Sequence, residues 1–380
     1  MTDARQLLIL GVSARAAAFS AIRSEYVPLA ADCFRDEDLI AACDCRRVDC
    51  YPTGLEAIAA DFPDCPWLYT GGLENHPRLV GRIEKRRQLL GNPEKVLRRV
   101  RDPLRLAEAL RHEGLPCLDV SATPPDAAHG EWLLKPLKSG GGRRIGFVSG
   151  TTSDRFQPGG RVYYQRYVVG TACSAVFVAA NGRAVWLGAT HQLIGTAWTG
   201  AKGFEYAGSI GPLDMPAKER TRWQDIGNCL AGRFELSGLF GVDAVMTDDA
   251  LWVVEVNPRY TASVEVLELA CGANLLRLHV RACQRGELPR EWPVRPGRRV
   301  GKAVVYAEMD GRVPANFGQF VRNVNSHPTR PAVADIPAGG RAFRRGEPLV
   351  TVLAEGRSLC EVEESLRQKV GLAQAALACV

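Results

Sequence analysis

The hydrophobic and polar positions of the chain form short apolar runs separated by longer amphipathic stretches. Residues 7–10 are a continuous apolar run typical of a buried strand, and the Ala-rich stretch 14–25 that follows predicts a helix. A second strand-like run, 67–70, ends next to two glycines. Strands that alternate with helices predict a parallel α/β unit over residues 1–80. No Gly-x-Gly-x-x-Gly follows the first strand, so a dinucleotide site is not indicated.

The middle of the chain predicts a helix followed by a β-rich region. Asp102 and Pro103 suit the N-cap and first position of a helix over 103–113, because the N–H that proline lacks is not needed there. Strands at 131–135 and 145–148 flank a Gly-rich loop and predict a hairpin. The other predicted elements are a β-rich block over 161–195, helices over 217–236 and 264–284, strands at 241–245 and 251–256, and short strands over 300–357 followed by a terminal amphipathic helix.

Composition narrows the class of protein. The 380 residues are 46% hydrophobic and 24% charged, which is ordinary for a globular chain of two or three domains. No run of about 18 apolar residues could span a bilayer. The apolar run at 7–10 is too short for a signal peptide. We therefore expect a cytoplasmic protein.

Charge and cysteine usage exclude two classes of site. The net charge is only +6, and the basic runs at 85–87 and 98–101 contain no aromatic residues on which bases could stack, so nucleic-acid binding is not indicated. The 12 cysteines form no Cys-x-x-Cys pair, and the six histidines are scattered. This pattern predicts buried thiols rather than a zinc site.

The segment WLLKPLKSGGGRRIGFV, residues 132–148, places Lys135 and Lys138 beside three consecutive glycines. Only eight lysines occur among the 48 basic residues, so two beside one loop suggest that an ammonium group is needed there. Glycines let backbone N–H groups approach an anion closely, which suits phosphate. An ordinary hairpin tip with charged flanks would also have this composition.

A second segment, GVDAVMTDDALWVVEVNPRY at 241–260, predicts two paired strands. Residues two apart on a strand share a face, so Glu255 and Asn257 project together and Asp243 can join them from the neighbouring strand. Three oxygen ligands on one face suit Mg²⁺, and Arg259 continues the same series beside them. The alternative is a solvent-exposed strand face with a salt bridge.

These residues carry a resemblance to a known family. The order of the motifs resembles that of the ATP-grasp superfamily. The motifs are a lysine before a Gly-rich loop, then Gln165-Arg166-Tyr167-Val168 with Gly170 and Ser174, and then Asp and Glu-x-Asn-x-Arg. The resemblance covers about residues 80–290. YTGGLENHP at 69–77 and the tail from Gly301 resemble the uncharacterised carboligase-related branch, which is associated with methanopterin-linked C1 metabolism.

The resemblance implies an α/β (α+β) chain with an ATP-grasp fold. The domains it implies are an N-terminal parallel α/β pre-ATP-grasp domain over 1–80, an ATP-grasp domain over 81–290 that binds nucleotide and magnesium, and a small β-rich C-terminal region over 291–380 with a terminal helix.

The resemblance also implies roles for individual residues, with ATP and Mg²⁺ (or Mn²⁺) as cofactors. The implied catalytic residues are Lys135, on the ATP phosphates, and Arg259, on the transferring phosphoryl group. The implied metal ligands are Asp243, Glu255 and Asn257. The implied nucleotide-binding residues are Lys135, Lys138, Gly140, Gly141, Gly142, Gln165, Tyr167, Val168 and Ser174.

One position departs from the family pattern. The family usually has a lysine after the aspartate that starts the helix, and this chain has Pro103 there. Arg101, Lys138 or Arg143 could supply the missing charge. A Gly-rich insert, 191–213, is either an ordinary surface loop or the wall of an acceptor pocket formed by Gln192, Lys202 and Tyr206.

Three functions remain open from the sequence. The first is an ATP-dependent carboxylate–amine ligase that forms an acylphosphate, in the biosynthesis of a C1-carrier coenzyme. The second is bicarbonate activation as in biotin carboxylase, although the Met-Lys-Met biotin site is missing and Tyr-Thr-Ala-Ser follows Arg259 in place of Gln-Val-Glu-His. The third is a non-catalytic ATP-binding protein. The expected partners are small-molecule carboxylate and amine substrates, with no nucleic acid and no membrane, and the chain could form a homodimer.

Overall fold

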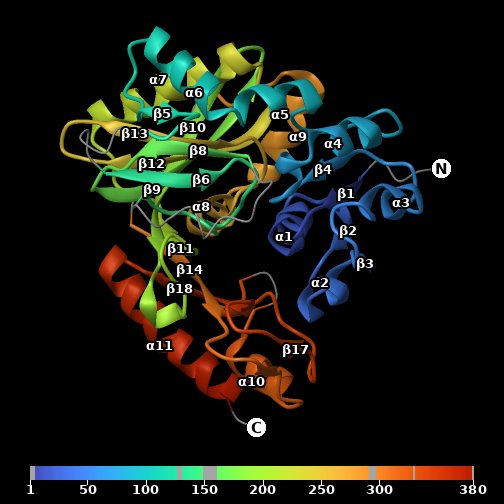
Figure 1. Ribbon diagram of the computed structural model, residues 1–380. Helices are drawn as coiled ribbons and strands as arrows, with labels where there is room; N and C mark the ends of the chain where they lie inside the picture. Colours follow the sequence, from blue (N-terminus) through green and yellow to red (C-terminus); the bar gives the residue numbers. More distant parts are fainter. Residues whose placement is uncertain (1–4, 126–130, 149–160, 291–296, 328–329, 379–380) are drawn as a thin grey trace.

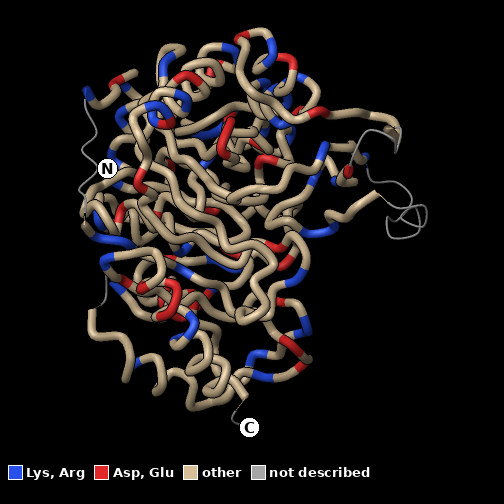
Figure 2. The backbone as a smooth tube through the Cα atoms, turned by 90° about the vertical axis from the view of Figure 1, so that its left-hand side faces the viewer, with Lys and Arg blue, Asp and Glu red and all other residues tan. Residues whose placement is uncertain are grey.

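The computed structural model describes residues 5–125, 131–148, 161–290, 297–327 and 330–378. The chain begins in a small α/β unit, passes into a central body built on a long antiparallel sheet, and ends in a β-rich region beneath it (Figure 1). No described helix is long and apolar enough to cross a membrane. Lys and Arg are intermixed with Asp and Glu along the described chain (Figure 2).

The N-terminal unit is a parallel four-stranded sheet in the order β3-β2-β1-β4, as the alternation of strands and helices predicts. Leu7 and Ile9 of β1 pack into one apolar cluster, whereas Leu8 and Leu10 pack into another, so both faces of the sheet are covered. Its elements are β1 Gln6–Leu10, α1 Arg15–Arg23, β2 Val27–Asp32, α2 Glu37–Ala42, β3 Asp44–Arg47, α3 Leu55–Ala60, β4 Trp67–Tyr69, the 3₁₀ turn η1 Leu73–Asn75 and α4 Pro77–Glu84.

The central body rests on an eight-stranded antiparallel sheet in the order β13-β12-β9-β10-β11-β14-β18-β16. Alternate residues of β9 face two different cores: Val176 packs on one side and Phe177 on the other. The Phe177 and Phe240 rings stack with centroids 4.9 Å apart, beneath Trp223. Its strands are β9 Thr171–Ala180, β10 Arg183–Ile194, β11 Tyr206–Gly211, β12 Gly238–Met246, β13 Leu251–Asn257, β14 Arg299–Tyr306, β16 Val333–Ala334 and β18 Pro348–Gly356, with the 3₁₀ turn η4 Ala197–Thr199 before β11.

Helices cover both faces of this sheet. Helix α7, Ala217–Phe234, lies on one face, and α8, Ala262–Cys271, and α9, Leu275–Arg285, lie on the other. The helical pattern expected over 264–284 is thus two helices rather than one. Gly272, with a φ of +64°, ends α8 in the left-handed conformation that glycine adopts without strain.

A smaller antiparallel sheet, β5-β8-β6-β7, faces the edge of the large one. Its strands are β5 Val120–Ser121, β6 Trp132–Pro136, β7 Gly146–Phe147 and β8 Val162–Arg166, and helices α5 Glu94–Val100 and α6 Pro103–His112 lead into it. The expected cap of α6 is confirmed, because Oδ1 of Asp102 accepts from the N–H groups of Leu104 at 3.0 Å and Arg105 at 3.3 Å. The predicted hairpin of β6 and β7 is confirmed as well.

The C-terminal region shares the large sheet, since β14, β16 and β18 extend it beyond β11. Its remaining elements are β15 Gly311–Arg312, β17 Ala342–Phe343, α10 Phe317–Val324 and the terminal helix α11 Leu359–Ala378. The domain boundaries at residues 80 and 290 stay predictions. None of the eleven described cysteines forms a disulfide.

Candidate active site

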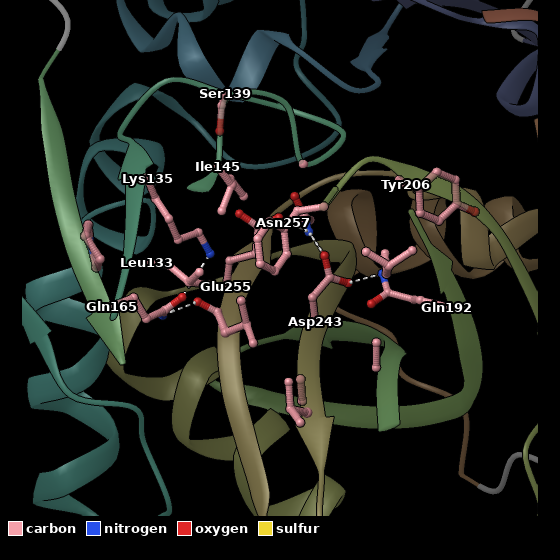
Figure 3. A pocket seen from close by; sticks show the side chains of 18 of the residues that line it. Leu133, Lys135, Ser139, Ile145, Gln165, Gln192, Tyr206, Asp243, Glu255 and Asn257 are labelled. Carbon is pink, nitrogen blue, oxygen red and sulfur yellow. Dashed lines mark hydrogen bonds between the residues drawn. The ribbon is translucent and has the colours of Figure 1, made fainter. Parts of the chain in front are cut away.

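A cavity of about 650 Å³ lies between the large and small sheets. Side chains enter it from β6 and β8 on one side and from β12 and β13 on the other, and Ser139 and Ile145 of the loop between β6 and β7 lie over it (Figure 3). Every predicted site residue except Lys138 lines the cavity: Lys135, Gly140, Gly141, Gly142, Gln165, Tyr167, Val168, Ser174, Asp243, Glu255, Asn257 and Arg259. The structure brings these residues together, and their roles stay predictions.

The three predicted metal ligands meet because of strand register. Asp243 on β12 pairs directly with Glu255 on β13, and Asn257 is two residues further along β13. The amide nitrogen of Asn257 donates to Asp243 at 3.0 Å and to Glu255 at 3.3 Å. Gln192 on β10 donates to the other oxygen of Asp243 at 3.2 Å (Figure 3). The carboxylates thus lie side by side within a network of amide donors.

The two carboxylates have opposite electrostatic environments. Withdrawal from solvent and the adjacent charge of Glu255 raise the pKa of Asp243, and the Ser174 hydroxyl opposes this shift only in part. Withdrawal from solvent also disfavours ionised Glu255, but the charges of Arg101 and Lys135 outweigh it and lower the pKa of Glu255. Glu255 is therefore a fixed anion, whereas Asp243 readily takes up a proton.

This donor set fits a divalent cation. Withdrawal from solvent and the adjacent charge of Glu255 both disfavour ionised Asp243, and a divalent cation beside the two carboxylates would favour the ionised form. Carboxylate and amide oxygens are ligands that Mg²⁺ accepts. Asn257 here turns its nitrogen to the carboxylates while Oδ1 accepts from Arg259 at 3.2 Å. As a ligand it would have to present Oδ1 to the metal.

Lys135 is aimed across the cavity from the small sheet. It is buried, and its Nζ donates to Oε1 of Gln165 at 2.9 Å. The Gln165 amide donates in turn to the backbone oxygen of Val254 on β13 at 3.0 Å. Lys138 is exposed and does not line the cavity, because it lies on the outer side of the loop after β6. The two lysines beside the glycines therefore have different surroundings.

The Gly-rich loop closes onto a segment 60 residues away. The backbone oxygen of Gly141 accepts from the N–H of Tyr206 at 3.1 Å. Gly142 has a φ of +72°, and a Cβ there would lie 1.7 Å from the carbonyl oxygen of Phe204. Phe147 and Phe204 then pack around Tyr167, with ring centroids 4.9–6.3 Å apart. The loop needs a glycine at 142 for this approach.

Arg101 is one of three candidates for the charge that is missing at Pro103, and it lies beside Glu255. Its Nη1 donates to Glu255 at 3.2 Å and to the carbonyl oxygen of Val256 at 3.1 Å, and it lines the cavity. Arg143 is exposed and donates to the carbonyl oxygen of Gly346, away from the cavity wall. Of the three candidates, Arg101 is the one beside the carboxylates.

Arg259 lies just beyond the end of β13, held by a residue that the sequence analysis did not assign to the site. Its Nε donates at 2.8 Å to Glu74, which is 1% exposed and belongs to turn η1 of the N-terminal unit. The neighbouring Asn75 donates to the carbonyl oxygen of Ser139 in the Gly-rich loop at 3.1 Å. The segment YTGGLENHP contains both residues, but nothing in its composition indicates partners 185 and 64 positions away.

The expected acceptor pocket is present in part. Gln192 and Tyr206 line the cavity, whereas Lys202 is exposed and lies outside it. Burial raises the pKa of Tyr206, whose hydroxyl hydrogen-bonds Ser209 at 2.8 Å. Gln192 and Tyr206 therefore contribute an uncharged amide and an uncharged hydroxyl to the cavity wall.

Parts of this chain are similar in sequence to known proteins. A family model described as the ATP-grasp domain matches residues 100–263. An uncharacterised protein of Methanocaldococcus jannaschii is 24% identical over 226 residues, which are 59% of this chain and 50% of that protein. The formate-dependent phosphoribosylglycinamide formyltransferase of Mycolicibacterium smegmatis is 33% identical over 109 residues, 28% of this chain and 26% of that protein. The matched segments thus span half or less of these relatives.

Solved structures match almost the whole chain in fold. The biotin carboxylase domain of Hydrogenobacter thermophilus 2-oxoglutarate carboxylase, determined with MgADP and bicarbonate, has a TM-score of 0.73 at 14% identity and covers 96% of this chain and 89% of that one. An L-amino acid ligase from Bacillus licheniformis has a TM-score of 0.68 at 14% identity, over 97% and 98% of the two chains. The matching family model and these likenesses show that the chain has an ATP-grasp fold with an ATP-grasp domain over residues 100–263, and ATP-grasp enzymes use ATP and Mg²⁺.

Proposed function

We propose that this protein is an ATP-dependent ligase that activates a carboxylate as an acylphosphate and passes the acyl group to an amine. The observation that carries the proposal is the convergence of Asp243, Glu255 and Asn257 opposite Lys135, within a cavity that a Gly-rich loop covers. Two carboxylates beside an amide suit a metal-bound nucleotide, and buried cations across from them suit phosphate.

The residues of the chain would act chiefly by position and charge. Mg·ATP supplies the phosphoryl group, which an oxygen of the acid accepts while ADP leaves. Lys135 and Arg101 would neutralise charge on the phosphates, and Arg259 would meet the charge on the group in transfer. The amine nitrogen then forms a bond to the acyl carbon, phosphate leaves with the bonding electron pair, and the amine proton is lost. The closed loop would keep water from the acylphosphate.

Two similarities support an acid and an amine as substrates. The name of the M. smegmatis relative specifies formate and phosphoribosylglycinamide, and the B. licheniformis structure is of an amino acid ligase. The uncharged groups of Gln192 and Tyr206, which line the same cavity as Arg259, suit a small polar substrate. A role in the biosynthesis of a C1-carrier coenzyme is part of the proposal and rests on the sequence resemblance alone.

Hydroxylamine trapping tests the proposal. Pools of amino acids and of pterin and furan coenzyme precursors are incubated with the protein, Mg·ATP and hydroxylamine. The expected products are ADP, phosphate and a hydroxamate in equal amounts. Formation of AMP and pyrophosphate without hydroxamate would show adenylation and contradict the acylphosphate route.

Bicarbonate activation is the second candidate, because the H. thermophilus structure of similar fold contains bicarbonate. ADP formation that depends on bicarbonate, in the absence of any other acid, would favour it. Tight binding of Mg·ATP with no turnover in any pool would instead favour a non-catalytic nucleotide-binding protein.

A further inference from the structure

We propose that Glu74 and Asn75, adjacent residues of turn η1, are positioning residues that hold both walls of the nucleotide cavity in their closed arrangement. Asn75 reaches the Gly-rich loop and Glu74 reaches Arg259 at the end of β13. The inference deepens the proposed function: the role of Asn75 rests on the use of ATP in this cavity, and the role of Glu74 rests on the phosphoryl transfer proposed for it. It gives the N-terminal unit a part in nucleotide handling.

Asn75 holds the loop through the loop's own backbone. Its Nδ2 donates to the carbonyl oxygen of Ser139, and Ser139 lies directly before the three glycines. Gly140 has no non-neighbouring atom within 4 Å of its Cβ position, so the loop has little packing of its own at that point. The hydrogen bond from Asn75 to Ser139 therefore contributes strongly to the position of this end of the loop.

Glu74 holds Arg259 in the opposite wall. The carboxylate is buried, and its Oε1 accepts from Nε of Arg259. Its Oε2 is also buried and has no hydrogen-bond partner among the described residues. A buried carboxylate is costly without a cation, so Arg259 and Glu74 stabilise each other's position strongly. Arg259 also donates to Asn257, which links Glu74 to the predicted metal ligands.

The turn that carries both residues is rigid. Gly72 has a φ of +102°, and a Cβ there would lie 2.4 Å from the Tyr51 hydroxyl and 2.7 Å from a methyl of Val12. Leu73 is fully buried, and Pro77 begins α4 directly after the turn. Glu74 and Asn75 are consequently held in a fixed position relative to each other, so one turn sets the position of both the loop and Arg259.

Hydrogen exchange tests the Asn75 contact without any substrate. In Asn75→Ala, backbone amides of residues 137–145 should exchange about three- to tenfold faster than in the wild type, the range expected for one lost hydrogen bond. Mg·ATP affinity, measured by calorimetry, should fall by a similar factor. Gln374→Ala is the matched control, because it removes a side-chain amide that donates to the carbonyl oxygen of Trp198 at 3.3 Å, outside the cavity.

Loop exchange in nucleotide-free Asn75→Ala that equals the wild type would overturn the proposal. Because this measurement needs neither an acid nor an amine, its outcome is separate from the hydroxylamine test of the ligase reaction. A wild-type protein that forms hydroxamate while Asn75→Ala shows unchanged loop exchange would refute the positioning role and leave the proposed function intact.

The role of Glu74 is tested by comparing how its substitution changes Mg·ATP affinity and the rate of ADP formation. Glu74→Ala should slow ADP formation at least tenfold and change Mg·ATP affinity less than threefold, because Arg259 acts on the group in transfer. Glu74→Gln keeps an oxygen that can accept from Nε of Arg259, so it should recover much of the rate. Unchanged ADP formation in Glu74→Ala, or equal losses in the Ala and Gln variants, would contradict the role assigned to Glu74.

Discussion

Two walls of the cavity differ in how their backbones are held. The strand wall is formed by β12 and β13, and the loop wall is the Gly-rich loop between β6 and β7, residues 137–145. Asp243 lies on β12, which hydrogen-bonds to β9 on one side and β13 on the other, so its position is fixed by two ladders. The loop between β6 and β7 is held by separate contacts from residues 75 and 206, and Arg143 from the loop reaches 346. Charge is thus preorganised on the strand wall, whereas the loop wall is assembled from contacts that can break singly.

This difference indicates a division of labour. A strand wall that holds two neighbouring carboxylates stores electrostatic repulsion that a bound cation relieves. A loop wall with few contacts can open to admit a nucleotide and close over it. Changes in the strand wall should therefore act on chemistry, and changes in the loop wall should act on affinity and exchange.

Glu255→Gln tests the strand wall and should have the largest effect. The change removes one charge at constant volume, and we expect ADP formation to fall about 100-fold or more. The melting transition should remain cooperative, because Glu255 is half-buried and Asn257 retains its contact with Asp243. Asp248→Asn, in the exposed turn of the same strand pair, is the control and should keep full activity. Full activity in Glu255→Gln would refute the metal assignment.

Lys135 and Lys138 compare a rigid position with a loop position directly. Lys135→Ala removes a buried ammonium aimed into the cavity, whereas Lys138→Ala removes an exposed one outside it. Calorimetry should show that Lys135→Ala weakens Mg·ATP binding more, by about 1–3 kcal/mol, the range for charge-assisted hydrogen bonds. Equal affinities in the two variants would contradict the role of Lys135 on the ATP phosphates.

The raised pKa of Asp243, about 7, predicts a pH dependence that an ordinary aspartate would not show. Below this pKa the carboxylate carries a proton that Mg²⁺ must displace, so the apparent Mg²⁺ affinity should fall as the pH drops from 8 to 6, by at most about tenfold per unit. The pH dependence of the apparent Mg²⁺ affinity is measured by titrating Mg²⁺ in the ADP assay at three pH values. Asp243→Asn is the control. In a direct binding assay of Mg²⁺·nucleotide, the affinity of this variant should not depend on pH. An affinity independent of pH over this range would show that Asp243 is already ionised.

The strand wall was largely predictable from sequence. Alternation in 251–257 places Glu255 and Asn257 on one face, and the pairing with Asp243 follows from a short hairpin. Asp102 and Pro103 predicted the start of α6 for a similarly local reason. These features depend on residues close together in the chain, where periodicity and turn chemistry carry the information.

The loop wall was predictable only in outline. Three glycines beside two lysines indicated a flexible, charged loop, but the contacts of Asn75 with Ser139 and of Glu74 with Arg259 join distant segments. Local sequence does not distinguish Arg101, Lys138 and Arg143 as the residue that faces Glu255 in place of the expected lysine. Packing brings Arg101 there. Contacts between distant segments determine these positions, and local sequence patterns do not predict such contacts.

The smallest and most discriminating effects concern the three glycines. In Gly140→Ala the new methyl meets no protein atom within 4 Å, so exchange protection of the loop in the nucleotide-free protein should be unchanged. In Gly141→Ala the methyl is equally free but φ is +64°, and the left-handed conformation should cost about 1–2 kcal/mol. In Gly142→Ala the methyl would meet the Phe204 carbonyl at 1.7 Å as well, so the loop cannot close as it does here. Exchange protection of residues 137–145 should decline in that order. If Gly140→Ala were as damaging as Gly142→Ala, the requirement would be for flexibility throughout the loop, and the close approach to Phe204 would not be what positions this wall.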